Sequence, residues 1–180
     1  VRTFNIDPLS HARAGDDAIE APNGARFDRE KGILPALLEG FWLQREEAKS
    51  RGDAVASYAY KIIMNSFYGV LATGSCRFAN DELAGAITEF GHYILRWAQE
   101  RLEQKGVRVI YGDTDSVFVD PGLAADCTAA AAVAAGADLG AEVDAELAAH
   151  IAEKYGVESR LELEFEKYYA RFLLPPMRGS

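Results

Sequence analysis

The sequence contains few cysteines, no long apolar run and a shortage of basic residues. Its two cysteines, Cys76 and Cys127, are far apart and lack metal-ligand spacing, which argues against a disulfide scaffold or a zinc site and predicts free buried thiols. No apolar stretch reaches the ~18 residues that a membrane span requires, so we expect no membrane partner. The first residues show no charged and apolar regions of a secretory signal. The distant cysteines favour a reducing compartment.

The shortage of basic residues bears on the class of partner. Lys and Arg number 19 against 28 Asp and Glu, a formal net charge of −9. Taken alone, this balance argues against a nucleic-acid binder, because neutralising phosphates requires clustered Lys and Arg. A site for divalent cations needs acidic residues, however, and these can dominate a chain with few basic surfaces. The remaining composition, 49% hydrophobic and 26% charged in 180 residues, indicates one globular domain with or without an appendage.

The first part of the chain predicts a connector followed by a helical hairpin. Residues 5–27 are rich in Asp, Gly, Pro and Ala without a clear period, so 1–27 is interpreted as a connector. Apolar residues then recur every three or four positions, which is typical of a helix with one buried stripe: Ile33, Leu34, Leu37, Leu38, Phe41 and Trp42. Arg51-Gly52-Asp53 ends this helix, and a second helical pattern follows. So short a link predicts two antiparallel helices within 28–72.

Residues 73–180 predict a second unit of mixed helix and strand. Asn80 and Asp81 offer an N-cap for a helix over 82–104, and Gly106 offers a stop. Two β-branched and aromatic runs, 107–111 and 116–119, flank a Gly-Asp-Thr-Asp turn and predict a β-hairpin. The alanine-rich segment 123–153 favours a helix, and 161–166 alternates apolar and acidic residues like a half-buried strand. The fold class is therefore α+β, an antiparallel sheet with covering helices plus the helical hairpin.

The turn between the two predicted strands carries a pair of carboxylates. Asp113 and Asp115 are two residues apart, so both can point at one spot, and a divalent cation would relieve their mutual repulsion. Hard oxygen ligands suit Mg²⁺, which takes one or two protein carboxylates and leaves positions for water and phosphates. The alternative is a plain turn, because Gly and Asp are common turn residues.

Polar and basic residues share faces of the two helices predicted in 28–72. Lys61, Asn65 and Tyr68 have helical spacing on one face, which presents a charge suited to phosphate, an amide and an aromatic plane. Arg45 and Lys49 lie one turn apart on one face of the preceding helix. In an antiparallel hairpin they would lie at a similar distance from the connecting turn as Lys61. Three converging cations could hold a triphosphate. The alternatives are an exposed face with a buried Tyr68, and solvated cations paired with Glu46 or Glu47.

Two of these segments resemble motifs of a known family. Residues 61–69 read K-x-x-x-N-S-x-Y-G and residues 111–116 read Y-G-D-T-D-S, which in that order are similar to motifs B and C of family B DNA polymerases. Lys31-Gly-Ile-Leu-Pro35, followed by Arg45 and Lys49, resembles the first fingers helix of that family. The short fingers tip and Cys76-Arg77-Phe78 look closest to the bacterial DNA polymerase II branch.

The resemblance implies an activity and a role for each candidate residue. It implies a palm-to-fingers connector (1–27), a fingers hairpin (28–72) and a partial palm (73–180) of an enzyme that transfers nucleotides to primer-template DNA with two Mg²⁺ ions. Asp115 would be the principal metal ligand and Asp113 a secondary one, and Glu162 or Glu164 could face the same site or simply solvent. The implied nucleotide ligands are Arg45, Lys49 and Lys61 for the triphosphate, and Asn65, Tyr68 and Gly69 for the nascent base pair.

The resemblance also predicts that the chain is a fragment. The chain opens in mid-pattern, and the family's motif A would precede Val1 while a lysine-rich element and the thumb would follow Ser180. We therefore expect an inactive fragment of a bacterial, nucleoid-associated enzyme. We also expect the fragment to self-associate, by pairing of an exposed sheet edge or by exchange of the fingers hairpin. A catalytically inactive polymerase-like structural or DNA-binding module is the alternative, and the residue at the motif A position would discriminate between the two. A reverse-transcriptase-like palm fits less well, because its hairpin usually carries adjacent aspartates.

Overall fold

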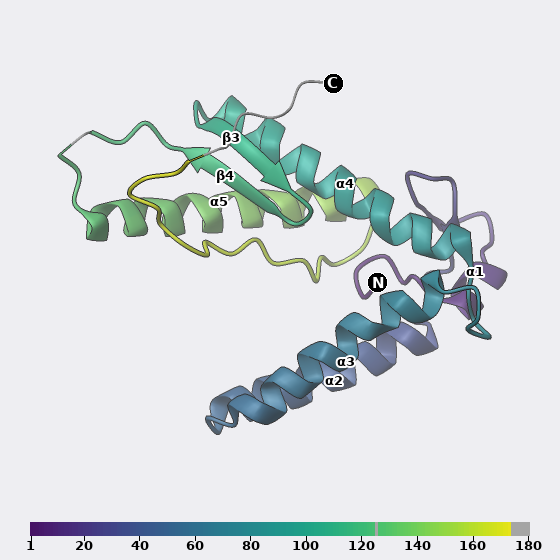
Figure 1. Cartoon of the computed structure of the whole chain (residues 1–180). Coiled ribbons are helices and arrows are strands. Elements are labelled where there is room, and N and C mark those ends of the chain that lie inside the picture. The colour runs from purple at the N-terminus through teal and green to yellow at the C-terminus, as the bar shows by residue number, and fades with distance from the viewer. Residues whose placement is uncertain (125, 174–180) are drawn as a thin grey trace.

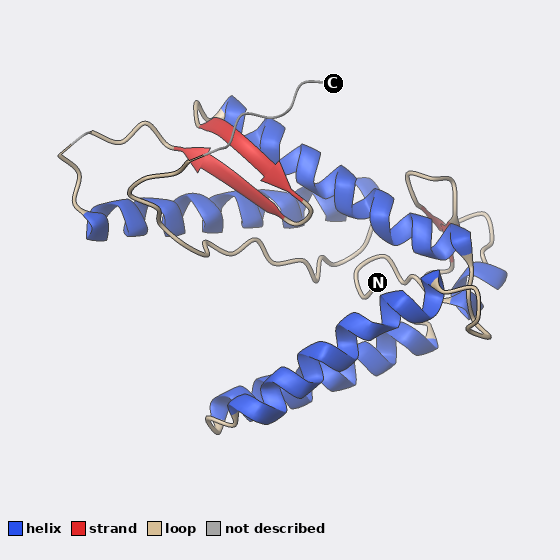
Figure 2. Ribbon diagram, in the orientation of Figure 1, coloured by secondary structure: helices blue, strands red, loops and turns tan. Residues whose placement is uncertain are grey.

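The computed structural model describes residues 1–124 and 126–173, apart from the side chain of Asp113. Figure 1 shows a two-helix arm that projects from a body of helices and a β-hairpin, and Figure 2 separates the helices from the strands. In chain order the elements are α1 (Pro8–Ala12), β1 (Ile19–Glu20), β2 (Arg26–Phe27), α2 (Ile33–Ser50), α3 (Ala54–Ala72), α4 (Asp81–Gln104), β3 (Arg108–Asp113), β4 (Ser116–Asp120) and α5 (Ala129–Tyr155). The α+β class is confirmed: the strands form two antiparallel pairs, β1–β2 and β3–β4.

The arm is the predicted helical hairpin. Helices α2 and α3 lie side by side and antiparallel (Figure 1), joined by a turn in which Gly52 adopts a φ of +72° that favours glycine. Asp53 begins α3 as its N-cap, because its side chain accepts a hydrogen bond from the Ala56 amide. Phe41 packs between the helices, with its ring centroid 6.2 Å from those of Tyr60 and Phe67. Of the predicted apolar stripe, Phe41 therefore faces α3 and Leu34 and Leu38 are buried, whereas Ile33 and Leu37 are exposed, so the stripe is only partly buried.

The main core lies where the N-terminal segment meets the base of the arm, α4 and the end of α5. Phe4 and Phe90 stack with ring centroids 3.7 Å apart, and the Tyr155 ring lies edge-on to both. Fourteen buried residues form this cluster, among them Ile6, Phe27, Leu38, Leu83 and Ile151. Residues 1–27, predicted to be a connector, thus hold more regular structure and more of the core than their composition indicates.

A buried aspartate caps two helices in this segment. Asp7 is 2% exposed, and its Oδ1 accepts hydrogen bonds from the Leu9 and Ser10 amides at 2.8 and 3.1 Å, at the start of α1. Its Oδ2 accepts a 2.7 Å hydrogen bond from the amide of Leu34, at the start of α2. Gly32 is required beside it, because a Cβ there would lie 2.6 Å from the Asp7 Cβ. The Asp7-Pro8 pair, an N-cap followed by proline, is the sequence signal for this site.

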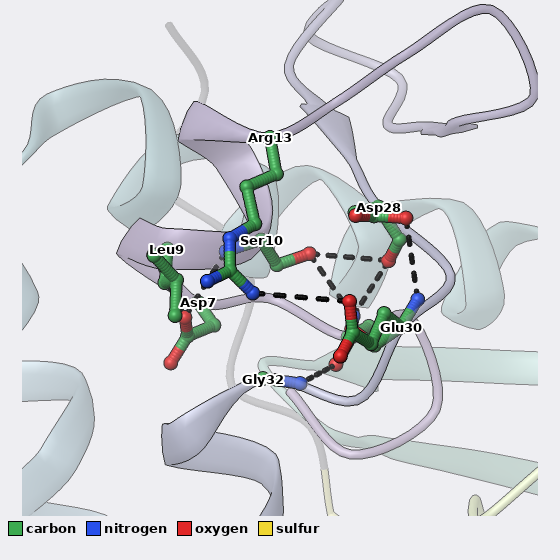
Figure 3. Close-up of polar contacts among 8 residues, drawn as sticks. Asp7, Leu9, Ser10, Arg13, Asp28, Glu30 and Gly32 are labelled. Atoms are coloured by element: carbon green, nitrogen blue, oxygen red, sulfur yellow. Dashed lines mark hydrogen bonds and ion pairs between the residues drawn. The ribbon is translucent and has the colours of Figure 1, made fainter.

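Asn5 is a second buried polar residue that joins the N-terminal segment to the start of α2. The Asn5 side chain accepts a 2.8 Å hydrogen bond from the Gly32 amide and donates to the carbonyls of Asp28 and Glu30 at 2.6 and 2.7 Å. Figure 3 shows Asp7, Ser10, Asp28, Glu30 and Gly32 gathered around this junction. Segments that are more than twenty residues apart in sequence are therefore joined at the base of the arm.

The second layer consists of the β3–β4 hairpin on α4 and α5. One face of the hairpin packs on a small core formed by Leu102, Val107, Val143 and partly buried neighbours such as Val109, Val117, Val119 and Trp97. Ion pairs join the two helices: Arg101 of α4 and Lys105, which caps the C-terminal end of α4, both contact Glu146 of α5, at 2.5 and 2.9 Å. The hydrogen bond from Arg101, and then that from Lys105, lowers the pKa of Glu146 to about 2.

The prediction of a strand at 161–166 is wrong. Residues 161–166 run as irregular chain along α5, and no described strand pairs with them. The predicted alternation is nevertheless present, because Leu161, Leu163 and Phe165 are partly buried while the intervening glutamates are exposed. The Leu163 amide donates to the Asp144 side chain of α5 at 2.7 Å instead of to a strand. Alternation thus reports one-sided burial, whereas a strand also needs a neighbouring strand to pair with.

Candidate functional site

The carboxylate turn lies at the tip of the β3–β4 hairpin. Asp113 is the last residue of β3 and is paired in register with Ser116, the first of β4. Between them, Thr114 has a φ of +38°, and the exposed Asp115 accepts a 3.2 Å hydrogen bond from the Ser116 hydroxyl. The structure describes the backbone of Asp113 but not its side chain. The Asp115 carboxylate is therefore accessible at the hairpin tip, as the sequence predicts.

Next to the turn, the Gln99 side chain of α4 packs closely against Gly112 of β3. A Cβ on Gly112 would lie 2.5 Å from the Nε2 atom of Gln99 and 3.9 Å from the Ser116 carbonyl. The glycine that precedes Asp113 thus lets the half-buried Gln99 side chain pack against β3. Sequence reasoning missed Gln99, because no local pattern marks a single polar residue within an amphipathic helix.

The polar face of α3 is open to solvent. Lys61, Asn65 and Tyr68 are all exposed, and within the described part of the chain neither Lys61 nor Asn65 forms an ion pair or side-chain hydrogen bond. The Tyr68 hydroxyl lies 3.4 Å from Thr88 Oγ1 on α4. At Gly69 an added Cβ would meet nothing within 4 Å, so the described chain leaves space beside this face. The alternative interpretation of this face predicts a buried Tyr68. That prediction is wrong, because 46% of the Tyr68 surface is exposed.

The two cations of α2 differ in their surroundings. Lys49 forms a 2.7 Å ion pair with Glu46, and both side chains are substantially exposed, so the pair contributes little to stability. Arg45 is half-buried, and its Nε is buried without a hydrogen-bond partner in the described residues. A buried donor without a partner costs free energy, which an oxyanion or water could recover. Pairing with a neighbouring glutamate, the alternative for these cations, therefore holds for Lys49 but not for Arg45.

Comparison with known proteins decides the family. The family model described as DNA polymerase family B matches residues 14–176. The chain belongs to DNA polymerase family B. It is 43% identical over its whole length to DNA polymerase II of Escherichia coli, of which it covers 23%. It is also 32% identical to the DNA polymerase of Archaeoglobus fulgidus, over 64% of this chain and 16% of that one.

A solved structure agrees with this family B assignment. The family B DNA polymerase from the archaeon Pyrobaculum calidifontis matches with a TM-score of 0.55 and 28% identity, over 86% of this chain and 20% of that chain. The chain thus spans less than a quarter of the length of these relatives. The resemblance to family B polymerases and to polymerase II of bacteria is confirmed.

The carboxylate turn is the candidate metal site of the chain. Within residues 1–124 and 126–173, the side chain of Asp113 aside, no three His, Cys, Asp or Glu residues group closely enough to hold a metal ion. Two carboxylates at a turn nonetheless fit Mg²⁺, which keeps several waters and takes further oxygen ligands from phosphates. Glu162 and Glu164 are exposed on the segment beside α5.

Two further sequence expectations concern membranes and thiols. None of the described helices combines the length and apolar character needed to cross a bilayer. Among the described residues, Cys76 and Cys127 are both free and half-buried.

Proposed function

We propose that this chain is the nucleotide- and metal-binding part of a DNA-directed DNA polymerase. Its arm (28–72) would act as the fingers, 73–180 as part of the palm, and 1–27 as the link between them. One observation carries the proposal: in a family B chain, Lys61, Asn65 and Tyr68 of the motif B match and Asp115 of the motif C match are all exposed. Lys61 and Asn65 in particular are free of competing side-chain partners in the described chain.

The exposed cations suit the triphosphate of an incoming deoxynucleotide. Lys61 offers an unpaired ammonium, Lys49 is held only by an exposed ion pair, and the Arg45 Nε lacks a partner that a phosphate oxygen would provide. Asn65 and Tyr68 would then contact the base pair, with the space beside Gly69 admitting the nucleotide. As charge moves onto the departing pyrophosphate, the three cations would stabilise it.

The carboxylate turn would hold the metal ions. Asp115 is assigned as the principal ligand and Asp113 as a secondary one. The close contact between Gln99 and Gly112 would hold the turn in position against α4. Two Mg²⁺ ions, when bound, supply charge that stabilises the attacking 3′-oxygen and the leaving oxygen. The chain's own contribution is to place these carboxylates at an accessible hairpin tip.

The partners follow from this reaction. We propose primer-template DNA and deoxynucleoside triphosphates as substrates, in the cytoplasm of a bacterium and beside its nucleoid. The isolated chain can also pair with a second copy through the free edges of the β3–β4 sheet. Retention of both aspartates of the Y-G-D-T-D-S segment weighs against a catalytically inactive module.

The assignment of the metal ligand is tested in the full-length polymerase that carries this segment. Asp115→Ala should abolish primer extension while leaving nucleotide binding nearly intact, because it removes a metal ligand and not a substrate contact. Asp113→Ala should be milder. Asp138→Ala, which removes an exposed carboxylate from α5, is the matched control and should extend normally. Normal extension by Asp115→Ala would contradict its assignment as a metal ligand, whereas an absence of extension by the wild-type enzyme would favour the inactive module.

The nucleotide face is tested by a second pair of variants in the same enzyme. Lys61→Ala should raise KM for the nucleotide and lower kcat/KM by roughly 10- to 100-fold, the usual cost of one lost charged contact. Arg51→Ala removes a cation from the same arm, but Arg51 pairs with Glu47, so its kinetics should match the wild type. Unchanged steady-state constants for Lys61→Ala would show that this face is merely solvated.

A further inference from the structure

A cleft at the base of the arm gathers cations from three parts of the chain. It has a volume of about 320 Å³ and is lined by four basic residues, Arg2, Arg29, Lys31 and Arg160, but by only two acidic ones, Glu39 and Glu158. This local excess of positive charge occurs in a chain whose net charge is −9. None of these residues belongs to the proposed nucleotide face or to the carboxylate turn.

Glu39 is the shared counter-ion of this cleft. It lies on the second turn of α2, and Lys31 Nζ donates a hydrogen bond to its Oε2. The hydrogen bond and charge of Lys31, followed by the charges of Arg2 and Arg160, lower the pKa of the Glu39 carboxyl. One carboxylate therefore faces three cations, so the positive charge of the cleft is only partly neutralised.

The remaining contacts leave Arg2 and Arg160 available but not Arg29, whose Nε donates to the Asp17 carbonyl at 2.9 Å and whose Nη1 donates to the carbonyls of Tyr155 and Gly156 at 3.0 and 3.2 Å. Arg2 has no carboxylate partner in the described chain, and its guanidinium lies 4.9 Å from the centroid of the Trp42 ring. Arg160 pairs with Glu158 at 2.9 Å and Arg29 with Asp17 at 3.0 Å, in contacts whose acidic side chains are 74% and 89% exposed. Exposed ion pairs of this kind are weak and exchange readily with a competing anion.

We propose that this cleft binds a phosphate group, with Glu39 as a built-in counter-ion that the phosphate displaces. The guanidinium groups of Arg2 and Arg160 offer the planar, bidentate donors that phosphate oxygens accept, and Lys31 and Arg29 add positive charge beside them. The choice of phosphate over carboxylate rests on the proposed function, because a polymerase handles phosphates of DNA and of released pyrophosphate. Glu39 precedes Arg45 by six residues, about 9 Å along the helix. The cleft is thus a second anion site beside the nucleotide face.

Trp42 provides a direct reporter for this site. The chain has two tryptophans, so Trp97→Phe leaves Trp42 as the single indole, next to Arg2. Titrating this 180-residue chain with pyrophosphate should change the Trp42 fluorescence saturably as Arg2 moves to the anion. A parallel titration uses a short single-stranded oligodeoxynucleotide. Tighter binding of the oligonucleotide assigns the phosphate to DNA, and tighter binding of pyrophosphate assigns it to the free anion.

Matched variants of the Trp97→Phe chain test each part of the proposal. Arg160→Gln and Lys31→Gln should each weaken pyrophosphate binding by roughly two- to fivefold, and Glu39→Gln should tighten it by a similar factor. Glu46→Gln, on the same helix but paired with Lys49, should leave the affinity unchanged. Circular dichroism verifies that every variant is folded.

Three outcomes would overturn the proposal. Loss of the Trp42 response in Lys61→Ala, with retention in Arg160→Gln, would place the anion on the nucleotide face. Equal binding of acetate would make the cleft a carboxylate site. A Trp42 signal that pyrophosphate does not change would mean that Glu39 fills the cleft permanently. Failure of the proposed function is distinct, because it would appear as normal extension by Lys61→Ala while binding at the cleft persists.

Discussion

At the scale of single residues, Asp7 shows how one side chain can serve two helices. Its two oxygens accept three backbone hydrogen bonds, two at the start of α1 and one at the start of α2. Because Asp7 is buried, water cannot replace these bonds when the carboxylate is removed. The residue therefore has a larger structural role than an ordinary surface N-cap.

Asp7→Ala should destabilise the chain by about 3 kcal/mol or more, because it leaves buried amides without acceptors. Asp53→Ala is the matched control, since Asp53 caps only α3 and does so at an exposed position, and it should cost about 1 kcal/mol. Urea unfolding followed by circular dichroism measures both. Equal losses for the two variants would contradict the double role of Asp7.

At the scale of elements, helix α5 is shaped to receive the segment that follows it. A Cβ on Gly136 would overlap the Phe165 ring, whereas a Cβ on Gly140 would lie at an ordinary 3.5 Å from the Phe165 amide nitrogen. Both glycines are in the interior of α5, where glycine normally weakens a helix. The first glycine is therefore explained by packing and the second is not.

Gly136→Ala should lower the free energy of unfolding by about 1–3 kcal/mol, because the methyl group displaces Phe165 from α5. Gly140→Ala should leave it unchanged or raise it by up to about 1 kcal/mol through better helix propensity. Thermal melts of the two variants separate the effects. A stabilised Gly136→Ala chain would mean that Phe165 moves without cost.

The α4–α5 interface should also make stability depend on pH. Partial burial and then the charge of Lys154 lower the pKa of His150 from 6.5, while Tyr93 and Trp97 contact its ring. The unfolded chain then binds the proton more readily than the folded chain. The contribution of His150 to the free energy of unfolding is therefore complete above pH 6.5. It is lost as the pH falls from there through the lowered pKa of the folded state.

His150→Gln should flatten this part of the stability profile. Unfolding in urea between pH 7.5 and about 5 gives the comparison, over the range in which histidine ordinarily titrates. His92→Gln removes an exposed histidine from α4 and controls for the loss of an imidazole. If the slope of the wild type persisted in His150→Gln, another group would have to bind the proton.

The elements that the sequence predicts well are those with strong local signals. Helix α4 begins at Asp81, after the Asn80 cap, and α3 begins at Ala54, after Asp53, because these side chains satisfy the first amides of their helices. The β3–β4 hairpin follows from its β-branched runs. The prediction of a strand at 161–166 is wrong because strand pairing depends on a distant neighbour. The Asn5 network could not be predicted for the same reason. Gln99 and the cleft around Glu39 likewise depend on tertiary contacts.

At the scale of the whole molecule, the chain contains only a share of a polymerase. It covers 23% of its bacterial relative, carries a net charge of −9, and groups no three metal-ligating side chains in the part that the structure describes.

The isolated chain should not extend a primer. Incubation with primer-template, all four deoxynucleotides and Mg²⁺ should give no product, because the remaining ligands and the DNA-holding surfaces are needed at the same time. The full-length polymerase is the positive control. Dose-dependent extension by the isolated chain that disappears in Asp115→Ala would contradict this expectation.

The arm has one end fixed and the other projecting into solvent. Asn5 and Asp7 anchor its base, whereas the Arg51-Gly52-Asp53 tip points away from the body (Figure 1). Length can therefore change at the tip without disturbing the anchor. Adding seven residues, about two helical turns, to each helix beside the tip would preserve the buried stripe and lengthen the arm by about 10 Å. Insertions and deletions accumulated over evolution, and peptide tags added by protein engineers, should accordingly be tolerated at this turn and not at the junction with α1.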